Sequence, residues 1–129
     1  MQELTDNSFE EALRHGKLLL MFYTDWCPMC PLITDMLNDL ERKEGGKFIF
    51  ARINHDDNPR AADTYGAFGV PIVIAFIEGT PIYGCAGILI PEVYRMIVEE
   101  LLYSFNEKAL KEKLERIEAF IDSCINKDL

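Results

Sequence analysis

The sequence contains no hydrophobic run long enough to cross a membrane. Its longest apolar stretches, residues 18–23 and 70–77, fall well short of the ~20 residues that a transmembrane helix needs. Basic residues are also scarce, because 13 lysines and arginines stand against 22 aspartates and glutamates, which gives a net charge of −9. A chain this acidic repels nucleic acid and anionic membranes, so we expect it to bind neither.

The N-terminal segment, residues 1–14, lacks the basic start and the apolar stretch of a signal peptide. This favours a cytoplasmic protein; a periplasmic or exported location would require that a signal peptide has been removed. The chain has 129 residues, of which 49% are hydrophobic and 27% charged, a globular composition. Because this length suits one hydrophobic core, a multidomain enzyme is excluded.

Cysteine is too scarce and too unevenly spaced for a disulfide-built scaffold. Of the four cysteines, Cys27 and Cys30 form one CxxC motif, whereas Cys85 and Cys124 stand alone. A structural zinc site built on CxxC pairs needs a second such pair, so we expect no metal. Single cysteines such as Cys85 and Cys124 are typically small apolar residues rather than redox sensors. The lone CxxC is typical of a redox dithiol.

The apolar pattern predicts an α/β fold with a mixed sheet and helices on both of its faces. Strands are expected at residues 18–23, 48–53, 72–77 and 82–86, the last two joined by a turn at Glu78-Gly79-Thr80. Helices are expected at residues 8–14, from the CxxC motif to Gly45-Gly46, from Asn58 to about Gly66, and from Pro91 to about Phe105. The dithiol therefore lies between a buried strand and a helix.

That placement suits thiol chemistry. The N–H groups and macrodipole at a helix N-terminus stabilise an anion, so Cys27 should ionise more readily than a free cysteine. Pro28 suits the first helical position, and Pro31 lies in the first turn, where a missing N–H costs little. Cys30, one turn further on, can attack a mixed disulfide on Cys27 and release the product. We expect Cys27 to be exposed and Cys30 shielded; the alternative is a pair of buried structural cysteines.

The sequence resembles the thioredoxin family well beyond the dithiol. Residues 4–9 look like the family's entry into its first helix, and twelve later residues fall at thioredoxin spacings from Cys27 without a gap. They are Asn54, Asp57, Asn58, Pro59, Tyr65, Gly66, Gly69, Val70, Pro71, Phe76, Gly79 and Gly87. The resemblance covers about residues 4–103. It implies a thioredoxin fold, with a central mixed β-sheet flanked by helices.

The resemblance also implies roles for individual residues. Cys27 is the attacking thiol and Cys30 the resolving thiol, and Pro71 matches the family's cis-proline, which faces the dithiol. Trp26, Pro28 and Met29 would support the dithiol together with Pro71. The shallow apolar surface that docks partner proteins would consist of Trp26, Gly69, Val70, Gly87 and Ile88.

The function that follows is thiol–disulfide exchange, in which the protein reduces protein disulfides without a cofactor. Its partners would be proteins that carry disulfides and an electron donor such as a thioredoxin reductase-like protein. An oxidant or isomerase that donates its disulfide is one alternative. A non-catalytic thioredoxin-like interaction module is the other, although such a module has no need for both cysteines.

The sequence departs from the family at one buried position. Met21 stands where thioredoxins carry an aspartate that is thought to help deprotonate the resolving thiol. Its loss should lower the pKa of Cys27 and slow proton transfer at Cys30. Arg52, which matches the family's lysine near that aspartate, is then expected to reach toward solvent or Asp25.

An extra helix follows the region of resemblance. Apolar residues recur there at steps of four and three, at Leu110, Leu114, Ile117, Ile121 and Cys124. A stripe this regular must be buried, either on its own domain or in a homodimer or partner contact. We expect residues 1–105 to form the thioredoxin-like domain of a monomer, with residues 106–129 packed on that domain as a helical extension.

Overall fold

The computed structural model describes residues 1–14, 16–44, 48–86, 92, 95–96, 99–100, 111–112, 115–120 and 122. The chain divides into two compact units, Met1–Pro91 and Glu92–Leu129. The described elements of the first unit are, in chain order, β1 (Gln2–Leu4), α1 (Phe9–Leu13), β2 (Lys17–Tyr23), α2 (Cys30–Glu44), β3 (Ile49–Asn54), α3 (Pro59–Thr64), β4 (Ile72–Ile77) and β5 (Thr80–Ala86).

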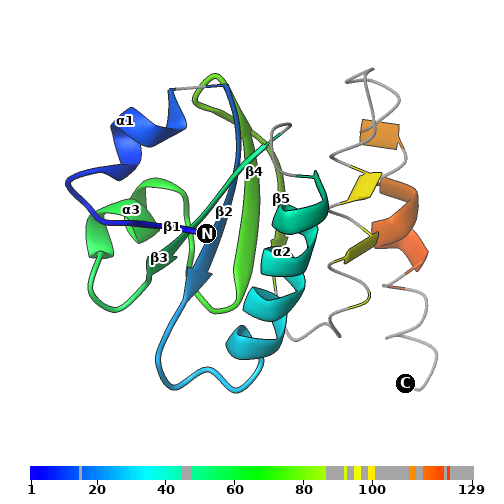
Figure 1. Ribbon diagram of the computed structural model, residues 1–129, viewed down its shortest axis with the longest axis horizontal. Helices are drawn as coiled ribbons and strands as arrows, with labels where there is room; N and C mark the ends of the chain where they lie inside the picture. The colour runs from blue at the N-terminus through cyan, green and yellow to red at the C-terminus, as the bar shows by residue number, and fades with distance from the viewer. Residues whose placement is uncertain are drawn as a thin grey trace. The chain divides into compact units, whose positions relative to one another are not determined.

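The strands of the first unit form one mixed sheet in the order β1-β3-β2-β4-β5. Strand β3 runs parallel to both β1 and β2, whereas β4 is antiparallel to β2 and to β5. Helices α1 and α3 cover one face of the sheet, and α2 covers the other (Figure 1). The architecture expected from the sequence is thereby confirmed.

Strand β1 is an addition to the elements expected from the sequence. It has three residues, which are too few to show the alternation of apolar and polar side chains that identifies a strand. Its pairing with β3 places Glu3 opposite Arg52. This register brings a carboxylate beside an arginine that bears on the candidate site.

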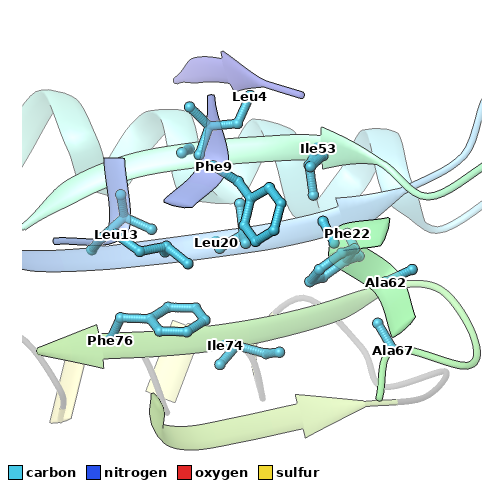
Figure 2. Close-up of a cluster of buried hydrophobic side chains, with 13 residues drawn as sticks. Leu4, Phe9, Leu13, Leu20, Phe22, Ile53, Ala62, Ala67, Ile74 and Phe76 are labelled. Atoms are coloured by element: carbon cyan, nitrogen blue, oxygen red, sulfur yellow. The ribbon is translucent and has the colours of Figure 1, made fainter. Parts of the chain in front are cut away.

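The core between the sheet and helices α1 and α3 follows from the period of two along β2. Leu18, Leu20 and Phe22 alternate along the strand and belong to one buried cluster with Phe9 of α1 and Phe76 of β4. Figure 2 shows Phe9, Leu20, Phe22 and Phe76 within this cluster. Burying such a side chain contributes about 1.5 to 3 kcal/mol, so the cluster fixes the path of β2 toward the dithiol.

The intervening residues of β2 lie on the face covered by α2. Leu19 and Met21 are 1% and 0% exposed, and the Thr34 hydroxyl of α2 donates a hydrogen bond of 3.6 Å to Sδ of Met21. The apolar stripe of α2 is buried on the same side, at Ile33, Met36, Leu37 and Leu40. The strand is therefore buried on both faces, as its continuous apolar run predicts.

The turn between β4 and β5 consists of Glu78 and Gly79, because Ile77 pairs with Thr80 across it. Both turn residues have positive φ, 49° at Glu78 and 83° at Gly79. This is the pattern of a type I′ hairpin turn, in which glycine is favoured. The expected hairpin is confirmed, with the N–H of Glu78 donating to the carbonyl oxygen of Gly16 at 2.8 Å.

We expect Gly79→Ala to lower the free energy of unfolding by about 1 kcal/mol, because a Cβ disfavours φ of 83°. Steric clash contributes little, since the nearest atom to that Cβ, the carbonyl oxygen of Leu13, lies at 3.7 Å. Gly69→Ala is the matched control, because it adds a Cβ in open space without a positive φ. Urea unfolding of both variants measures the difference; equal stabilities would contradict the argument.

The second unit is helical at its described residues. Ile117 is half-buried there, whereas Met96 and Phe120 are 48% and 65% exposed. The other members of the apolar stripe, Leu110, Leu114, Ile121 and Cys124, lie outside the described residues. The boundary between the two compact units assigns residues 92–105 to the second unit, whereas the sequence analysis places them in the first.

None of the helices in the described part of the chain combines the length and the apolar character that a membrane span requires.

Candidate active site

The site is centred on a disulfide between Cys27 and Cys30, whose Cα atoms are 5.4 Å apart. The pair follows the end of β2, and a tight turn connects the two residues. The N–H of Cys27 donates to the carbonyl oxygen of Thr24 at 3.4 Å, and the N–H of Cys30 donates to that of Cys27 at 3.3 Å. The buried strand therefore presents both sulfur atoms at the same end of the sheet.

The exposure of Cys27 differs from the expectation. Cys27 and Cys30 are 5% and 3% exposed, so the disulfide buries both residues and neither is open to solvent. In the disulfide, the sulfur of Cys30 shields that of Cys27. The sequence analysis considers a free Cys27 thiolate, which lacks this shielding. Any difference in accessibility between the two thiols must arise when the disulfide opens.

Helix α2 begins at Cys30 rather than at Pro28. Pro28 and Met29 form the bend of the CxxC loop, and the first backbone bond of the helical type runs from the N–H of Ile33 to the carbonyl oxygen of Met29 at 3.1 Å. Pro31 occupies the first turn of α2, where its missing N–H has no partner to lose. Cys27 thus precedes the helix, and Cys30 is its first residue.

The start of β4 lies beside the dithiol end of the sheet. The peptide bond between Val70 and Pro71 is cis, and β4 begins at the next residue, Ile72. Ile72 pairs with Phe22 near the end of β2, the strand that leads into the CxxC loop. The sheet register therefore brings Pro71 and the dithiol to the same end of two neighbouring strands.

A shallow apolar groove of about 350 Å³ adjoins this end of the sheet. It contains Gly69 and Val70, as the resemblance implies. Of the other predicted members of the docking surface, Trp26 is not part of the groove lining, and Gly87 and Ile88 lie outside the described residues. The described residues that line the groove are Gly66, Phe68, Gly69, Val70, Ile72 and Ala86.

Phe68 is the largest of the lining residues that the sequence analysis misses. Its side chain is 84% exposed, which is unusual for a phenylalanine. The available signal was its place in a glycine-containing loop, between Gly66 and Gly69, outside any strand or helix pattern. It adds a large apolar side chain to the groove.

Trp26 is held in an exposed position by a hydrogen bond. The indole is 69% exposed, and its Nε1–H donates to Oδ2 of Asp56 at 2.8 Å. Asp56 is fixed in turn, because its N–H donates to Oδ1 of Asn54 at 2.9 Å. The indole therefore exposes an apolar surface at the residue that precedes Cys27.

A second hollow, which we call the Cys30 pocket, has a volume of about 290 Å³. It lies on the α2 side of the sheet, where Met21 is buried and its sulfur accepts a hydrogen bond from the Thr34 hydroxyl. Cys30 is the only cysteine among the described residues that line the pocket. The pocket is lined by Tyr23, Thr24, Asp25, Cys30, Pro31, Thr34, Asp35 and Arg52.

The side chain of Arg52 contacts Glu3 and Tyr23. Its Nε–H donates to Oε1 of Glu3 at 2.8 Å, and its guanidinium carbon lies 4.5 Å from the ring centroid of Tyr23. The Tyr23 hydroxyl donates to the other oxygen of Glu3 at 2.8 Å. The sequence analysis expects Arg52 to reach toward solvent or Asp25. The Arg52 side chain is partly exposed, and it binds Glu3 in place of Asp25 because strand β1, absent from the sequence analysis, supplies that carboxylate.

The same contacts affect Tyr23. Burial raises the pKa of the Tyr23 phenol, and the hydrogen bond to the Glu3 carboxylate raises it further. The phenol therefore stays protonated and keeps its bond to Glu3 at neutral pH. In the described part of the chain, we find no cluster of three or more histidine, cysteine, aspartate or glutamate side chains able to hold a metal ion.

These features define a class of protein. A CxxC disulfide at the end of a central parallel strand, with a cis-proline at the start of the adjacent antiparallel strand, forms a dithiol–disulfide exchange site.

Comparison with known proteins gives the family. Residues 1–91 match the family model for thioredoxin. The chain is 30% identical over 80 residues to a thioredoxin of Staphylococcus haemolyticus, which covers 62% of this chain and 77% of the relative. It is 27% identical over 100 residues to a thioredoxin of Staphylococcus saprophyticus (78% and 96% covered) and 28% identical over 98 residues to one of Bacillus subtilis (76% and 94% covered).

The chain therefore belongs to the thioredoxin family. Together with the joined Cys27–Cys30 pair, this membership makes it a thiol–disulfide oxidoreductase.

Proposed function

We propose that the protein reduces disulfide bonds in other proteins, with Cys27 as the attacking thiol and Cys30 as the resolving thiol. The observation that carries the proposal is the position of the pair. Cys27 lies in the loop beside the exposed Trp26, whereas Cys30 opens α2 and lines a pocket on the α2 side of the sheet. A substrate that docks on the Trp26 side meets Cys27 first.

The reaction proceeds in two exchanges. The Cys27 thiolate attacks one sulfur of the substrate disulfide, which breaks that bond and releases the other substrate sulfur as a thiolate. The Cys30 thiolate then attacks the sulfur of Cys27 and displaces the second substrate thiolate. The product is the Cys27–Cys30 disulfide, the form in which the two residues stand in the structure.

The docking surface in this proposal combines Trp26, Gly69 and Val70 with Phe68. The groove supports it by its apolar lining, and the resemblance adds Gly87 and Ile88. Pro28, Met29 and Pro71 shape the dithiol loop and its surroundings. An extended substrate segment can pair with the Val70 backbone, a common mode of peptide recognition.

The proposal extends to the partners and the state of the protein. Protein disulfides are the substrates, a thioredoxin reductase-like protein returns the electrons, and no cofactor, nucleic acid or membrane takes part. The protein acts as a monomer in the cytoplasm, with residues 106–129 packed on the domain. The net charge of −9 supports the absence of nucleic acid and anionic membranes among its partners.

Equilibration with glutathione redox buffers tests the direction of exchange. A reductant should have a midpoint potential near the thioredoxin value of about −270 mV, whereas a strong oxidant lies near about −120 mV. The fraction of the Cys27–Cys30 disulfide is measured by alkylation and mass spectrometry. A midpoint at or above the glutathione buffer's own range would show that the protein donates its disulfide instead.

We expect Trp26→Ala to raise KM for a disulfide-bonded protein substrate about tenfold, because an exposed aromatic side chain at a docking surface contributes at least 1 to 2 kcal/mol. The rate with a small disulfide should change little. Asp56→Asn is the matched control, since it keeps the indole and removes only the charge of its partner. Equal loss with both types of substrate would assign Trp26 to the dithiol instead of the docking surface.

A further inference from the structure

Thr24 is a buried polar side chain in the Cys30 pocket without a hydrogen bond to any other residue that the structure describes. It is 3% exposed, and its Oγ1 is shielded from solvent. Leaving a buried hydroxyl without a partner destabilises the folded state, because its hydrogen bonds to water are lost and not replaced. Unpaired groups of this kind call for an explanation, and catalysis is one.

The other hydroxyl groups of the pocket and the guanidinium of Arg52 are already engaged. The Thr34 hydroxyl donates to the sulfur of Met21, and the guanidinium of Arg52 binds Glu3. The Tyr23 hydroxyl also donates to Glu3. Of the three hydroxyl groups in the pocket, that of Thr24 is the one without a described partner.

The reduced form of the protein supplies the missing partner. In the disulfide, the sulfur of Cys30 has no proton to donate and accepts hydrogen bonds weakly. When the bond opens, Cys30 carries an S–H donor or a thiolate acceptor in the same pocket as Thr24. Met21, a buried residue of β2, offers no base, because its thioether sulfur cannot take a proton at neutral pH.

We propose that in the reduced protein the Thr24 hydroxyl donates a hydrogen bond to the sulfur of Cys30 and stabilises its thiolate. This inference rests on the proposed function, because it concerns the resolving step. Cys30 gives its proton to water in the Cys30 pocket, and the Thr24 hydroxyl holds the thiolate that remains. The Cys30 thiolate then bonds to the sulfur of Cys27, and the electron pair of the broken bond leaves on the substrate sulfur.

The pocket can carry the proton onward. Its volume of about 290 Å³ exceeds the ~30 Å³ that one water occupies in the liquid, so several waters fit. The charged and titratable side chains that line it beside Cys30 are Tyr23, Asp25, Asp35 and Arg52. Asp25 and Asp35 are exposed, and their carboxylates connect the pocket with bulk solvent as proton acceptors.

Mixing the reduced protein with dithiobis-nitrobenzoate separates the two exchanges in one experiment. Cys27 releases the first thionitrobenzoate at a rate proportional to the reagent concentration. Cys30 releases the second at a rate independent of that concentration. All variants carry Cys85→Ala and Cys124→Ala, so that only the dithiol reacts.

Thr24→Val should slow the second phase about tenfold at neutral pH and shift its pH profile upward by about one unit, with the first phase unchanged within about twofold. Thr24→Ser keeps the hydroxyl and should restore the second phase. Thr34→Val is the matched control, because it removes a hydroxyl of the same pocket that already donates a hydrogen bond to the sulfur of Met21. If Thr24→Val does not fold, Thr24→Ala is measured in the same way.

An unchanged second phase in the variant that lacks the hydroxyl would overturn the proposed hydrogen bond to Cys30. So would an equal loss in Thr24→Ser or in Thr34→Val, because the effect would then come from packing. Failure of the proposed function looks different. In that case Cys27→Ser would leave the first phase intact.

Discussion

Cys30→Ser is expected to leave the protein covalently joined to its substrate. The Cys27 thiolate still attacks the substrate disulfide, but a serine hydroxyl cannot displace the bound sulfur, so the mixed disulfide accumulates. Turnover should fall to background, while the joined species survives non-reducing electrophoresis and disappears on addition of dithiothreitol. Cys27 and Cys30 are both buried in the disulfide, so the size-conserving serine should preserve the fold.

Cys27→Ser is the matched control for this experiment. It removes the attacking thiol and should capture nothing, although Cys30 remains. If both single variants trap equal amounts of substrate, either sulfur can attack and the assignment of roles is wrong. Mapping the joined peptide identifies the cysteine directly.

Met21→Asp should be the most destabilising change near the site. The side chain is 0% exposed, and Arg52, the nearest candidate counter-charge from the sequence analysis, is bound to Glu3 instead. A buried carboxylate without a partner costs about 3 to 5 kcal/mol when charged. Met21→Leu keeps the volume and should cost less than about 1.5 kcal/mol.

The cost should depend on pH. Burial raises the folded-state pKa of the introduced carboxyl above its unfolded value of about 3.9, so the unfolded state loses its proton first. Stability therefore falls as the pH rises from that value through the folded-state pKa and is lowest above both. Urea unfolding at pH 5 and pH 8 should show the larger loss at pH 8. Equal losses would mean that a cation or water reaches the carboxyl.

The function of Met21→Asp separates two ways of serving Cys30. If loss of the proton from Cys30 limits the resolving step, an added base should accelerate that step at a pH where the carboxyl is ionised. The concentration-independent phase with dithiobis-nitrobenzoate reports it. An unchanged rate would show that proton transfer from Cys30 is already fast.

The central strands and the dithiol could be predicted because their signals are local. A continuous apolar run identifies β2, and CxxC next to it identifies the chemistry. Strand β1 could not be predicted in this way, since three residues carry no periodicity. Arg52 was misplaced for the same reason, because its partner Glu3 is brought to it only by the pairing of β1 with β3.

The features of the site that escaped prediction depend on burial in three dimensions. Thr24 follows β2 as an ordinary polar residue in the sequence, and only the folded structure shows that its hydroxyl is buried. Cys27 is buried while it is bonded to Cys30, and the sequence does not show whether that disulfide has formed. Phe68 differs from a core phenylalanine only because its loop places the side chain in solvent.

The short strand β1 has a consequence for how the protein behaves at high concentration. As one edge of the sheet, it exposes backbone groups to which another chain could add a strand. Only three residues are available there, and the exposed side chain of Glu3 holds Arg52 across the outer strands. A length this small and a fixed ion pair at the rim discourage edge-to-edge association, so this side of the sheet is protected against aggregation.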